Sequence, residues 1–130
     1  MAVKPESQFI SGIHSKLDRE VYRMKNNNPY IGGIPDCYYS GNKGDLWVEY
    51  KFIPKLPLKV AVKPDVSALQ LDWMKGRHAE GRNIALIVGC PEGGVIFKIH
   101  EEYNLPSDLF RARLKSRTEI ADWITKQTKR

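Results

Sequence analysis

Two acidic residues and a lysine stand at spacings that could bind a metal ion within one predicted β-hairpin. Asp36 precedes a short β-forming run, residues 41–44 are a dense turn cluster, and Glu49 and Lys51 lie in the strand that follows. If the four turn residues form the loop, Asp36 lies directly opposite Glu49. Lys51 shares their face, because side chains two apart in a strand point the same way. Opposed Cβ atoms are about 5 Å apart, so the carboxylates repel unless a cation lies between them. Their oxygen atoms suit Mg²⁺, and Lys51 is placed to hold a water or a phosphate oxygen.

The opposite face of this hairpin is apolar enough to face a core, because it carries Cys37, Tyr39, Leu46, Val48, Tyr50 and Phe52. An isolated Glu-x-Lys is common, however, and ordinary polar residues on a solvated strand face would have the same sequence. The Pro-Asp at the start of the partner strand, in matching register, favours a site. On the hairpin alone, both interpretations stay open.

Two predicted helices must bring further polar side chains towards the hairpin. The first runs from Glu6 to about Leu17, with Pro5 suited to its first turn and Phe9 and Ile10 at helical spacing. Glu6 lies on the inward stripe of this helix. It is therefore either a functional carboxylate or a first-turn acid that the helix dipole favours.

The second helix is predicted from Ser67 to Glu80 and ends at Gly81. Gln70 lies close to its inward stripe. Ser67-x-x-Gln70 is also a capping box, which is a good structural explanation of Gln70 on its own. The residues expected on the buried side are Val66, Leu69, Trp73 and Met74.

The segment 53–64, here called the arm, joins the hairpin to the second helix. It cannot be helical, because Pro54, Pro57 and Pro64 interrupt it. Apolar residues alternate with lysines, which predicts an extended arm or edge strand with one basic side. Such a segment could follow a nucleic-acid backbone or pair with another subunit, although lysines and prolines also protect sheet edges from aggregation.

The remaining elements complete one domain. A nearly continuous apolar run at 83–90 is typical of a strand covered on both faces. A capping box, Ser116-x-x-Glu119, opens a helix that carries Trp123. The other predicted segments are a short strand at 21–25, a loop at 26–33, a last strand at 95–99 and a helix at about 107–114.

Composition limits the classes of partner. The chain has 130 residues, a net charge of +6 and a pI near 9.4, which favours a polyanionic partner. No apolar run approaches membrane-spanning length and the first residues lack the apolar segment of a signal peptide, so we expect a cytoplasmic location and no membrane partner. Cys37 and Cys90 show no metal-ligand spacing and are expected to be free thiols.

In this order, Glu6, Pro35-Asp36, Glu49-Tyr50-Lys51 and Gln70 resemble the signature of the PD-(D/E)XK nuclease superfamily. The similarity is closest to small phage-encoded members, and beyond them to virus-type replication-repair nucleases and archaeal Holliday-junction resolvases. The resemblance covers roughly residues 5–99. It implies an α/β (α+β), restriction-endonuclease-like core, αβββαβ, whose mixed central sheet is flanked by helices. Residues 1–130 would form this single domain, with a C-terminal helical extension at about 105–130.

The resemblance also implies a role for each motif residue. Asp36 and Glu49 resemble the metal ligands, the Tyr50 carbonyl a further ligand, and Glu6 the first-helix glutamate that completes the metal site in some members. The implied cofactor is Mg²⁺, with Mn²⁺ as a substitute. Lys51 resembles the lysine that positions or activates the attacking water, and the other catalytic candidate, supporting this lysine or the DNA, is Gln70.

The implied activity is a metal-dependent DNA endonuclease of phage DNA processing, recombination or repair, acting in an infected bacterial host and resolvase-like in its selectivity. Candidate contacts to the DNA backbone are Lys43, Lys55, Lys59, Lys63, Arg77 and Arg82. Two alternatives stay open: a catalytically inactive nuclease-fold DNA-binding protein and an RNA-directed nuclease. A homodimer is also expected, because symmetric cutting of two strands needs two sites; the candidate surfaces are the arm and the Trp123 helix.

Overall fold

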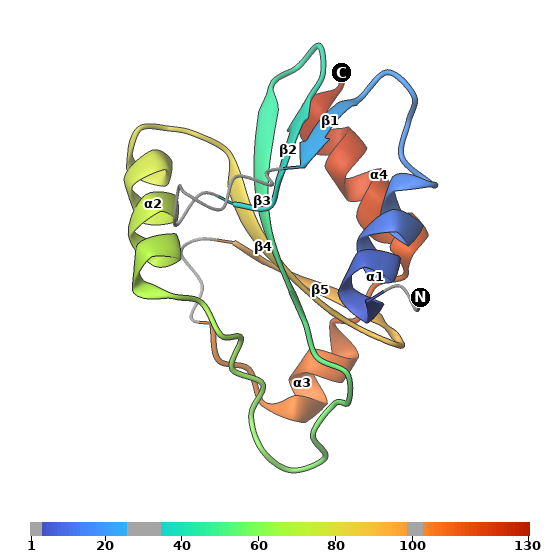
Figure 1. Cartoon of the computed structure of the whole chain (residues 1–130), viewed down its shortest axis with the longest axis vertical. Coiled ribbons are helices and arrows are strands. Elements are labelled where there is room, and N and C mark those ends of the chain that lie inside the picture. Colours follow the sequence, from blue (N-terminus) through green and yellow to red (C-terminus); the bar gives the residue numbers. More distant parts are fainter. Residues whose placement is uncertain (1–3, 26–34, 99–102) are drawn as a thin grey trace.

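The computed structural model describes residues 4–25, 35–98 and 103–130, and within them a mixed sheet carries helices on both faces (Figure 1). The predicted loop at 26–33 and the last residue of the predicted strand at 95–99 lie outside the described residues. In chain order the elements are α1 (Pro5–His14), β1 (Tyr22–Lys25), β2 (Cys37–Ser40), β3 (Asp45–Phe52), α2 (Ala68–Ala79), β4 (Ile84–Cys90), β5 (Gly93–Lys98), α3 (Ser107–Ala112) and α4 (Arg117–Thr128).

The five strands lie in the order β1-β2-β3-β4-β5, and only the pair β3–β4 is parallel. The predicted hairpin register is confirmed, because Ser40 pairs with Asp45 and Cys37 with Val48. One further step of this register places Asp36 opposite Glu49. The parallel pair requires a crossover connection, and α2 with the arm supplies it.

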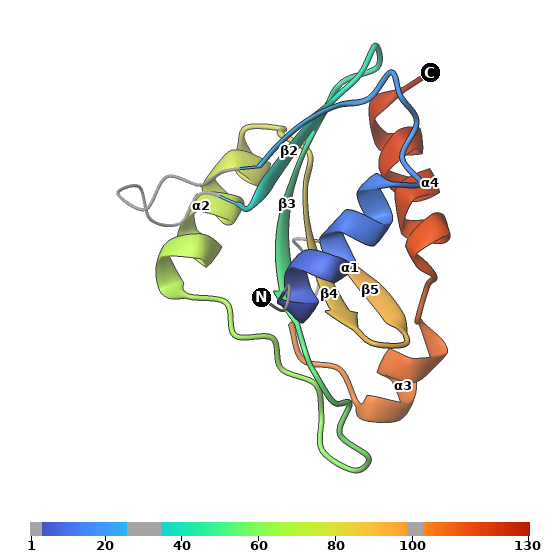
Figure 2. The ribbon, with the colours of Figure 1, turned by 45° about the vertical axis from the view of Figure 1, so that its right-hand side comes forward.

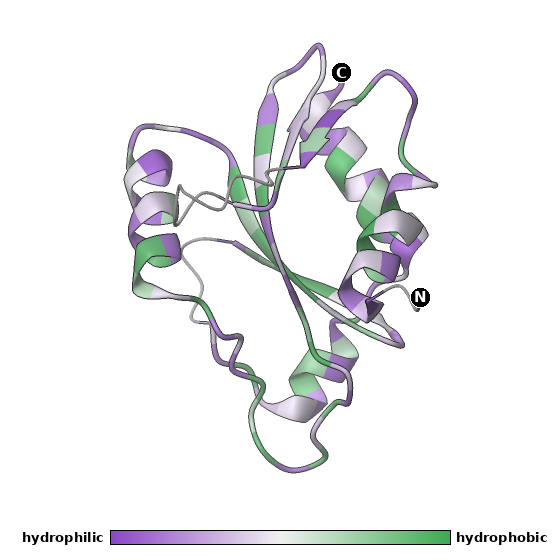
Figure 3. Ribbon diagram, in the orientation of Figure 1, coloured by the Kyte–Doolittle hydropathy of each residue, from purple (hydrophilic) through white to green (hydrophobic). Residues whose placement is uncertain are grey.

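Helices α1 and α4 cover one face of the sheet, whereas α2, α3 and the arm cover the other (Figures 1 and 2). The strand side chains alternate between the two faces as expected. β4 is buried over its whole length, as its continuous apolar run predicts, and the hydrophobic residues of β4 and β5 meet at the centre of the molecule (Figure 3). No helix among the described residues is long and apolar enough to cross a membrane.

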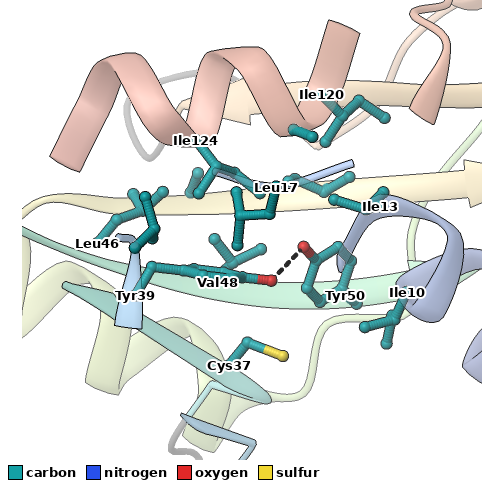
Figure 4. Close-up of a cluster of buried hydrophobic side chains, with 14 of the residues drawn as sticks. Ile10, Ile13, Leu17, Cys37, Tyr39, Leu46, Val48, Tyr50, Ile120 and Ile124 are labelled. Atoms are coloured by element: carbon teal, nitrogen blue, oxygen red, sulfur yellow. Dashed lines mark hydrogen bonds between the residues drawn. The ribbon is translucent and has the colours of Figure 1, made fainter. Parts of the chain in front are cut away.

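The core between α1, α4 and the sheet contains the predicted apolar face of the hairpin (Figure 4). Within it, the hydroxyl groups of Tyr39 and Tyr50 lie 2.7 Å apart, and His14 Nε2 lies 2.7 Å from the Tyr39 hydroxyl. Burial raises the pKa of both tyrosines. Each buried hydroxyl therefore has a partner, and the chain of hydrogen bonds holds β2, β3 and α1 together.

The C-terminal helix belongs to this same core. Ile120, Ala121 and Ile124 of α4 are buried against α1 and the sheet, and Thr128 is fully buried. The capping box at Ser116 is confirmed, since Ser116 and Glu119 exchange both hydrogen bonds. α4 therefore follows the strands in the sequence and also forms part of the layer that covers one face of the sheet.

Of the two forms predicted for the arm, an extended segment or an edge strand, the edge strand is not observed: the prolines interrupt a ladder, and Val62 makes an isolated bridge to Leu105. The prediction that Leu69 lies on the buried side of α2 is wrong. Leu69 is 66% exposed instead of buried. Met74 is the buried residue of α2, and Trp73 packs beside it against Trp47, so the apolar side of the helix does not include Leu69.

A glycine in β4 is required by the close approach of α1. A Cβ added at Gly89 would lie 2.6 Å from two ring atoms of Phe9, whereas one added at Gly76 in α2 would meet nothing within 4 Å. We expect Gly89→Ala to lower the free energy of unfolding by about 1–3 kcal/mol through overpacking. The matched variant Gly76→Ala should raise it by about 0.5–1 kcal/mol. Urea unfolding measures both, and equal effects of the two alanines would contradict this account of the core.

Candidate active site

The candidate site lies just before the first residue of β2, where β3 continues beyond its antiparallel partner. Trp47 donates its N–H to the Asn83 carbonyl just before β4 at 3.0 Å, and Ile53 donates to the Gly89 carbonyl of β4 at 2.8 Å. The N–H of Tyr50, an odd number of residues from both, therefore faces the other way, towards β2. Asp36 Oδ2 accepts the Tyr50 N–H at 3.0 Å. The Asp36 carboxylate thus occupies the place where a further β2 residue would pair. Because N–H and C=O of one strand residue point to the same side, the Tyr50 carbonyl faces this position as well.

Glu49 is the most deeply buried acidic residue of the site, with 2% of its surface exposed. Its Oε2 accepts a hydrogen bond from Gln70 Nε2 at 2.9 Å and lies 3.4 Å from Lys51 Nζ. Its Oε1 is buried and has no hydrogen-bond partner. A buried carboxylate oxygen without a hydrogen bond is costly, so Oε1 is the atom of the site that requires an explanation.

Asp36 perturbs the Glu49 carboxylate that lies opposite it in the register. Burial, and next the negative charge of Asp36, raise the pKa of Glu49 to about 7, while Lys51 acts in the opposite direction. The pKa of Glu6 is also raised, by burial and then by Asp36. The three acidic groups therefore share one electrostatic environment, and their mutual repulsion is not compensated by Lys51 alone.

Gln70 is both the capping residue and a site residue. Its Oε1 accepts the Ser67 N–H at 3.0 Å, while Ser67 Oγ accepts the Gln70 N–H at 3.1 Å. This leaves Nε2 to hold Glu49. The predicted capping box is thus confirmed, and the cap fixes the orientation of the amide that contacts the Glu49 carboxylate.

A cleft of about 460 Å³ brings together all six residues proposed for catalysis or metal binding. Lys63 of the arm closes it, together with Pro64 and Asp65, which sequence reasoning did not select. The complete lining is Glu6, Asp36, Glu49, Tyr50, Lys51, Phe52, Ile53, Lys63, Pro64, Asp65 and Gln70.

The donor atoms of this cleft fit a hard divalent cation of the Mg²⁺ type. Among the described residues Glu49 Oε1 has no hydrogen-bond partner, Asp36 accepts the Tyr50 N–H through Oδ2, and the Tyr50 carbonyl faces the same place. No group of three or more acidic, histidine or cysteine side chains in the described part of the chain is arranged to hold a metal. Two carboxylates and a carbonyl match Mg²⁺, which keeps several waters and needs few protein ligands.

The six candidate DNA contacts fall into two groups. Lys55, Lys59 and Lys63 are exposed on the arm, at the cleft end of β3. The others lie elsewhere. Lys43, in the β2–β3 turn, donates to the Lys126 carbonyl of α4 at 3.2 Å. Arg77 pairs with Glu80 at 3.1 Å, and Arg82 lies near the start of β4. The structure therefore does not bring Lys43, Arg77 and Arg82 to the cleft.

The structure contains a basic groove between α1 and β1 that the sequence did not lead us to expect. It has a volume of about 430 Å³, and Arg23 and Lys25 of β1 face three serines and His14 of α1 across it. Burial, followed by the charges of Arg23 and Lys25, lowers the pKa of His14 to about 4. The signal in the sequence was the pair of basic residues two apart in the short strand, which share one face.

The fold agrees with that of a solved nuclease. The chain is similar to Archaeoglobus fulgidus Hjc, a Holliday junction resolvase from an archaeal hyperthermophile, with a TM-score of 0.57 and 13% sequence identity over 89% of this chain and 96% of that chain. No protein-family model matches the sequence, and no curated protein matches it. The similarity establishes the restriction-endonuclease-like fold that the sequence motif implies.

The raised pKa of Glu49 should make the free energy of unfolding depend on pH when EDTA keeps the protein free of metal. Between about pH 4.5 and 7 the unfolded chain loses a proton that folded Glu49 retains, so the free energy of unfolding decreases as the pH rises through this window. The loss should be on the order of 2–3 kcal/mol. His14 acts with the opposite sign, because its lowered pKa removes stability as the pH falls from 6.5 to 4.

Comparison with Glu49→Gln isolates the carboxylate, since the His14 contribution is the same in both proteins. Urea unfolding at several pH values should show similar stabilities near pH 4.5 and a growing advantage of the variant towards pH 8. Parallel curves for the two proteins would contradict the buried, repelled carboxylate.

Proposed function

We propose that the protein is a metal-dependent DNA endonuclease that hydrolyses phosphodiester bonds. The observation that carries the proposal is the buried, unpaired Oε1 of Glu49 beside Asp36, in a cleft that Lys51 and Lys63 line. Carboxylates alone would repel a phosphodiester, so this arrangement is explained by a cation between them. The fold likeness to a resolvase supports the same reaction class.

A bound Mg²⁺ would supply Lewis-acid activation of the scissile phosphate and of a water. Asp36, Glu49 and the Tyr50 carbonyl would hold it. The Lys51 ammonium, 3.4 Å from Glu49 and partly exposed to the cleft, orients the attacking water and stabilises the negative charge that develops on the phosphate. Gln70 holds Glu49 in position from behind, and Lys63 binds a phosphate of the DNA backbone.

The finer parts of the proposal have different support. Selectivity for a branched substrate such as a Holliday junction rests on the fold likeness. Action in phage DNA processing, within the cytoplasm of an infected bacterium, rests on the sequence resemblance. A homodimer is proposed because two symmetric cuts require two sites, and light scattering would test it.

The activity test uses supercoiled plasmid, a four-way junction, its linear duplex arms and a matched RNA, each with Mg²⁺, Mn²⁺ or EDTA. We expect cleavage of DNA only when metal is present. Asp36→Asn and Glu49→Gln should each lower the rate at least about 1,000-fold, because the cation loses a ligand. The control is Lys43→Ala. Lys43 lies in the β2–β3 turn, at the opposite end of β3 from the cleft, and its ammonium contacts α4, so this variant should retain activity.

Metal-independent binding without turnover would instead identify a non-cleaving DNA-binding protein. Preferential cleavage of the matched RNA would identify an RNA-directed nuclease. Equal cleavage by wild type and Asp36→Asn would point to a contaminating nuclease and overturn the assignment of the site.

Gln70 makes a separate prediction for the metal site. Gln70→Met keeps the length of the side chain but removes the hydrogen bond to Glu49 Oε2, so the Mg²⁺ concentration for half-maximal activity should rise about 10- to 100-fold. Ser67→Ala weakens the cap by about 1 kcal/mol but leaves the Gln70 amide free to hold Glu49. A Mg²⁺ titration that shifts equally in both variants would mean that Gln70 acts only through helix stability.

A further inference from the structure

The arm carries two apolar side chains that nothing in the described structure covers. Leu58 is 82% exposed and Val60 is 66% exposed, whereas Leu56 and Val62 on either side are buried at 8% and 2%. Leu58 is the most exposed of the large apolar residues among the described parts of the chain. Residues 58–60, here called the tip, lie in the loop that projects beyond the body of the molecule below α3 (Figures 1 and 2).

The main chain around the tip is held in place, although its side chains are free. Ser107 Oγ donates to the Leu58 carbonyl at 3.1 Å, and Val62 and Leu105 exchange two main-chain hydrogen bonds of 2.7 and 3.0 Å. Leu56 and Val62 are anchored in the same apolar cluster as Phe110 of α3. The loop therefore has a fixed main chain but exposes two apolar side chains to water. This exposure is unfavourable, because apolar surface in contact with water raises the free energy of the folded protein.

The charges around the tip suit a polyanion. Lys55, Lys59 and Lys63 are all exposed, and the arm contains no acidic residue. Hydrophilic and hydrophobic segments alternate along this loop (Figure 3). Lysines on both sides of exposed leucine and valine can contact phosphates while the apolar side chains meet the bases.

The tip is also close to the cleft along the chain. Ile53 and Lys63, at the two ends of the arm, both line the cleft that contains Asp36 and Glu49. The five residues from Ile53 to Leu58 span at most about 17 Å. One strand of DNA advances 3.4 Å per nucleotide, so the tip lies within roughly five base steps of Ile53, which lines the cleft.

We propose that the tip is an apolar wedge that enters DNA between two base pairs near the cleavage site. Leu58, with Val60 beside it, would unstack one base step, and Lys55 and Lys59 would hold the flanking phosphates. Opening a step costs a few kcal/mol and is cheapest where stacking is already interrupted, so the wedge favours branched or nicked DNA. The inference rests on the proposed function and specifies how its substrate is selected.

A second copy of the chain fits the tip less well. A symmetric dimer contact places the same surface against itself, which would bring the lysines of two arms together without any acidic residue of the arm to compensate them. The like charges oppose that pairing, whereas they favour a phosphate backbone.

The test measures unstacking directly and does not require cleavage. A forked duplex and a continuous duplex carry 2-aminopurine at successive positions around the fork, and its fluorescence rises when the base leaves the stack. With EDTA present, the wild-type protein should raise the fluorescence at one or two positions of the fork by several-fold. Leu58→Ala combined with Val60→Ala should abolish this rise and weaken binding to the fork by about tenfold relative to the continuous duplex.

Leu69→Ala is the matched control. Leu69 is as exposed as Val60, at 66%, but it lies on α2 and outside the tip. This control should leave both readouts unchanged. All variants should unfold at the wild-type temperature, since the replaced side chains are exposed. An unchanged fluorescence rise in the double variant would overturn the wedge. A wild-type dimer that the double variant converts to a monomer would likewise overturn it and identify the tip as a subunit contact.

The outcomes for the wedge and for the endonuclease can be told apart. A double variant that still cuts linear duplex but loses the fluorescence rise at the fork supports the wedge on an active nuclease. A protein that shows the rise but cuts no DNA under any metal condition would retain the wedge and lose the proposed endonuclease activity.

Discussion

The repulsion between Asp36 and Glu49 is the constraint on which the rest of the site depends. The fold holds both carboxylates at one end of β3, in an environment where burial and their mutual charge raise the pKa of Glu49 to about 7. Three contacts keep them there: the Tyr50 N–H on Asp36, the Gln70 amide on Glu49 and the Lys51 ammonium. Glu49 Oε1 has no partner among these contacts, and the cation that we propose would offset the repulsion there.

The site could be predicted from the sequence where it depends on local rules. A four-residue turn sets the register of the hairpin, and the register sets which carboxylates face each other. The capping box at Ser67 likewise fixes Gln70 through residues three apart. The same local rules gave the buried strand β4 and the apolar face that contains Tyr39 and Tyr50.

The failures concern contacts between distant segments. Apolar residues and lysines do alternate along the arm, but its prolines prevent a β-strand. Which apolar residues of the arm are buried depends on their contacts with α3. Lys43 could not be assigned without knowing that α4 ends beside the hairpin turn. Arg23 and Lys25 were visible in the sequence, whereas the serines of α1 that face them across a groove were not.

The position of α4 has a consequence for how the chain folds. α1 and α4 share one core, although α4 begins more than 100 residues after α1 ends, and β3 reaches its parallel partner β4 only after the whole arm and α2. Closing such long loops costs entropy before the contacts that reward it have formed. The hairpin can form early, and α1 can cover part of its apolar side through Phe9 and His14. The cover is complete only when α4 packs, so we expect the contacts between the two ends of the domain to form late in folding.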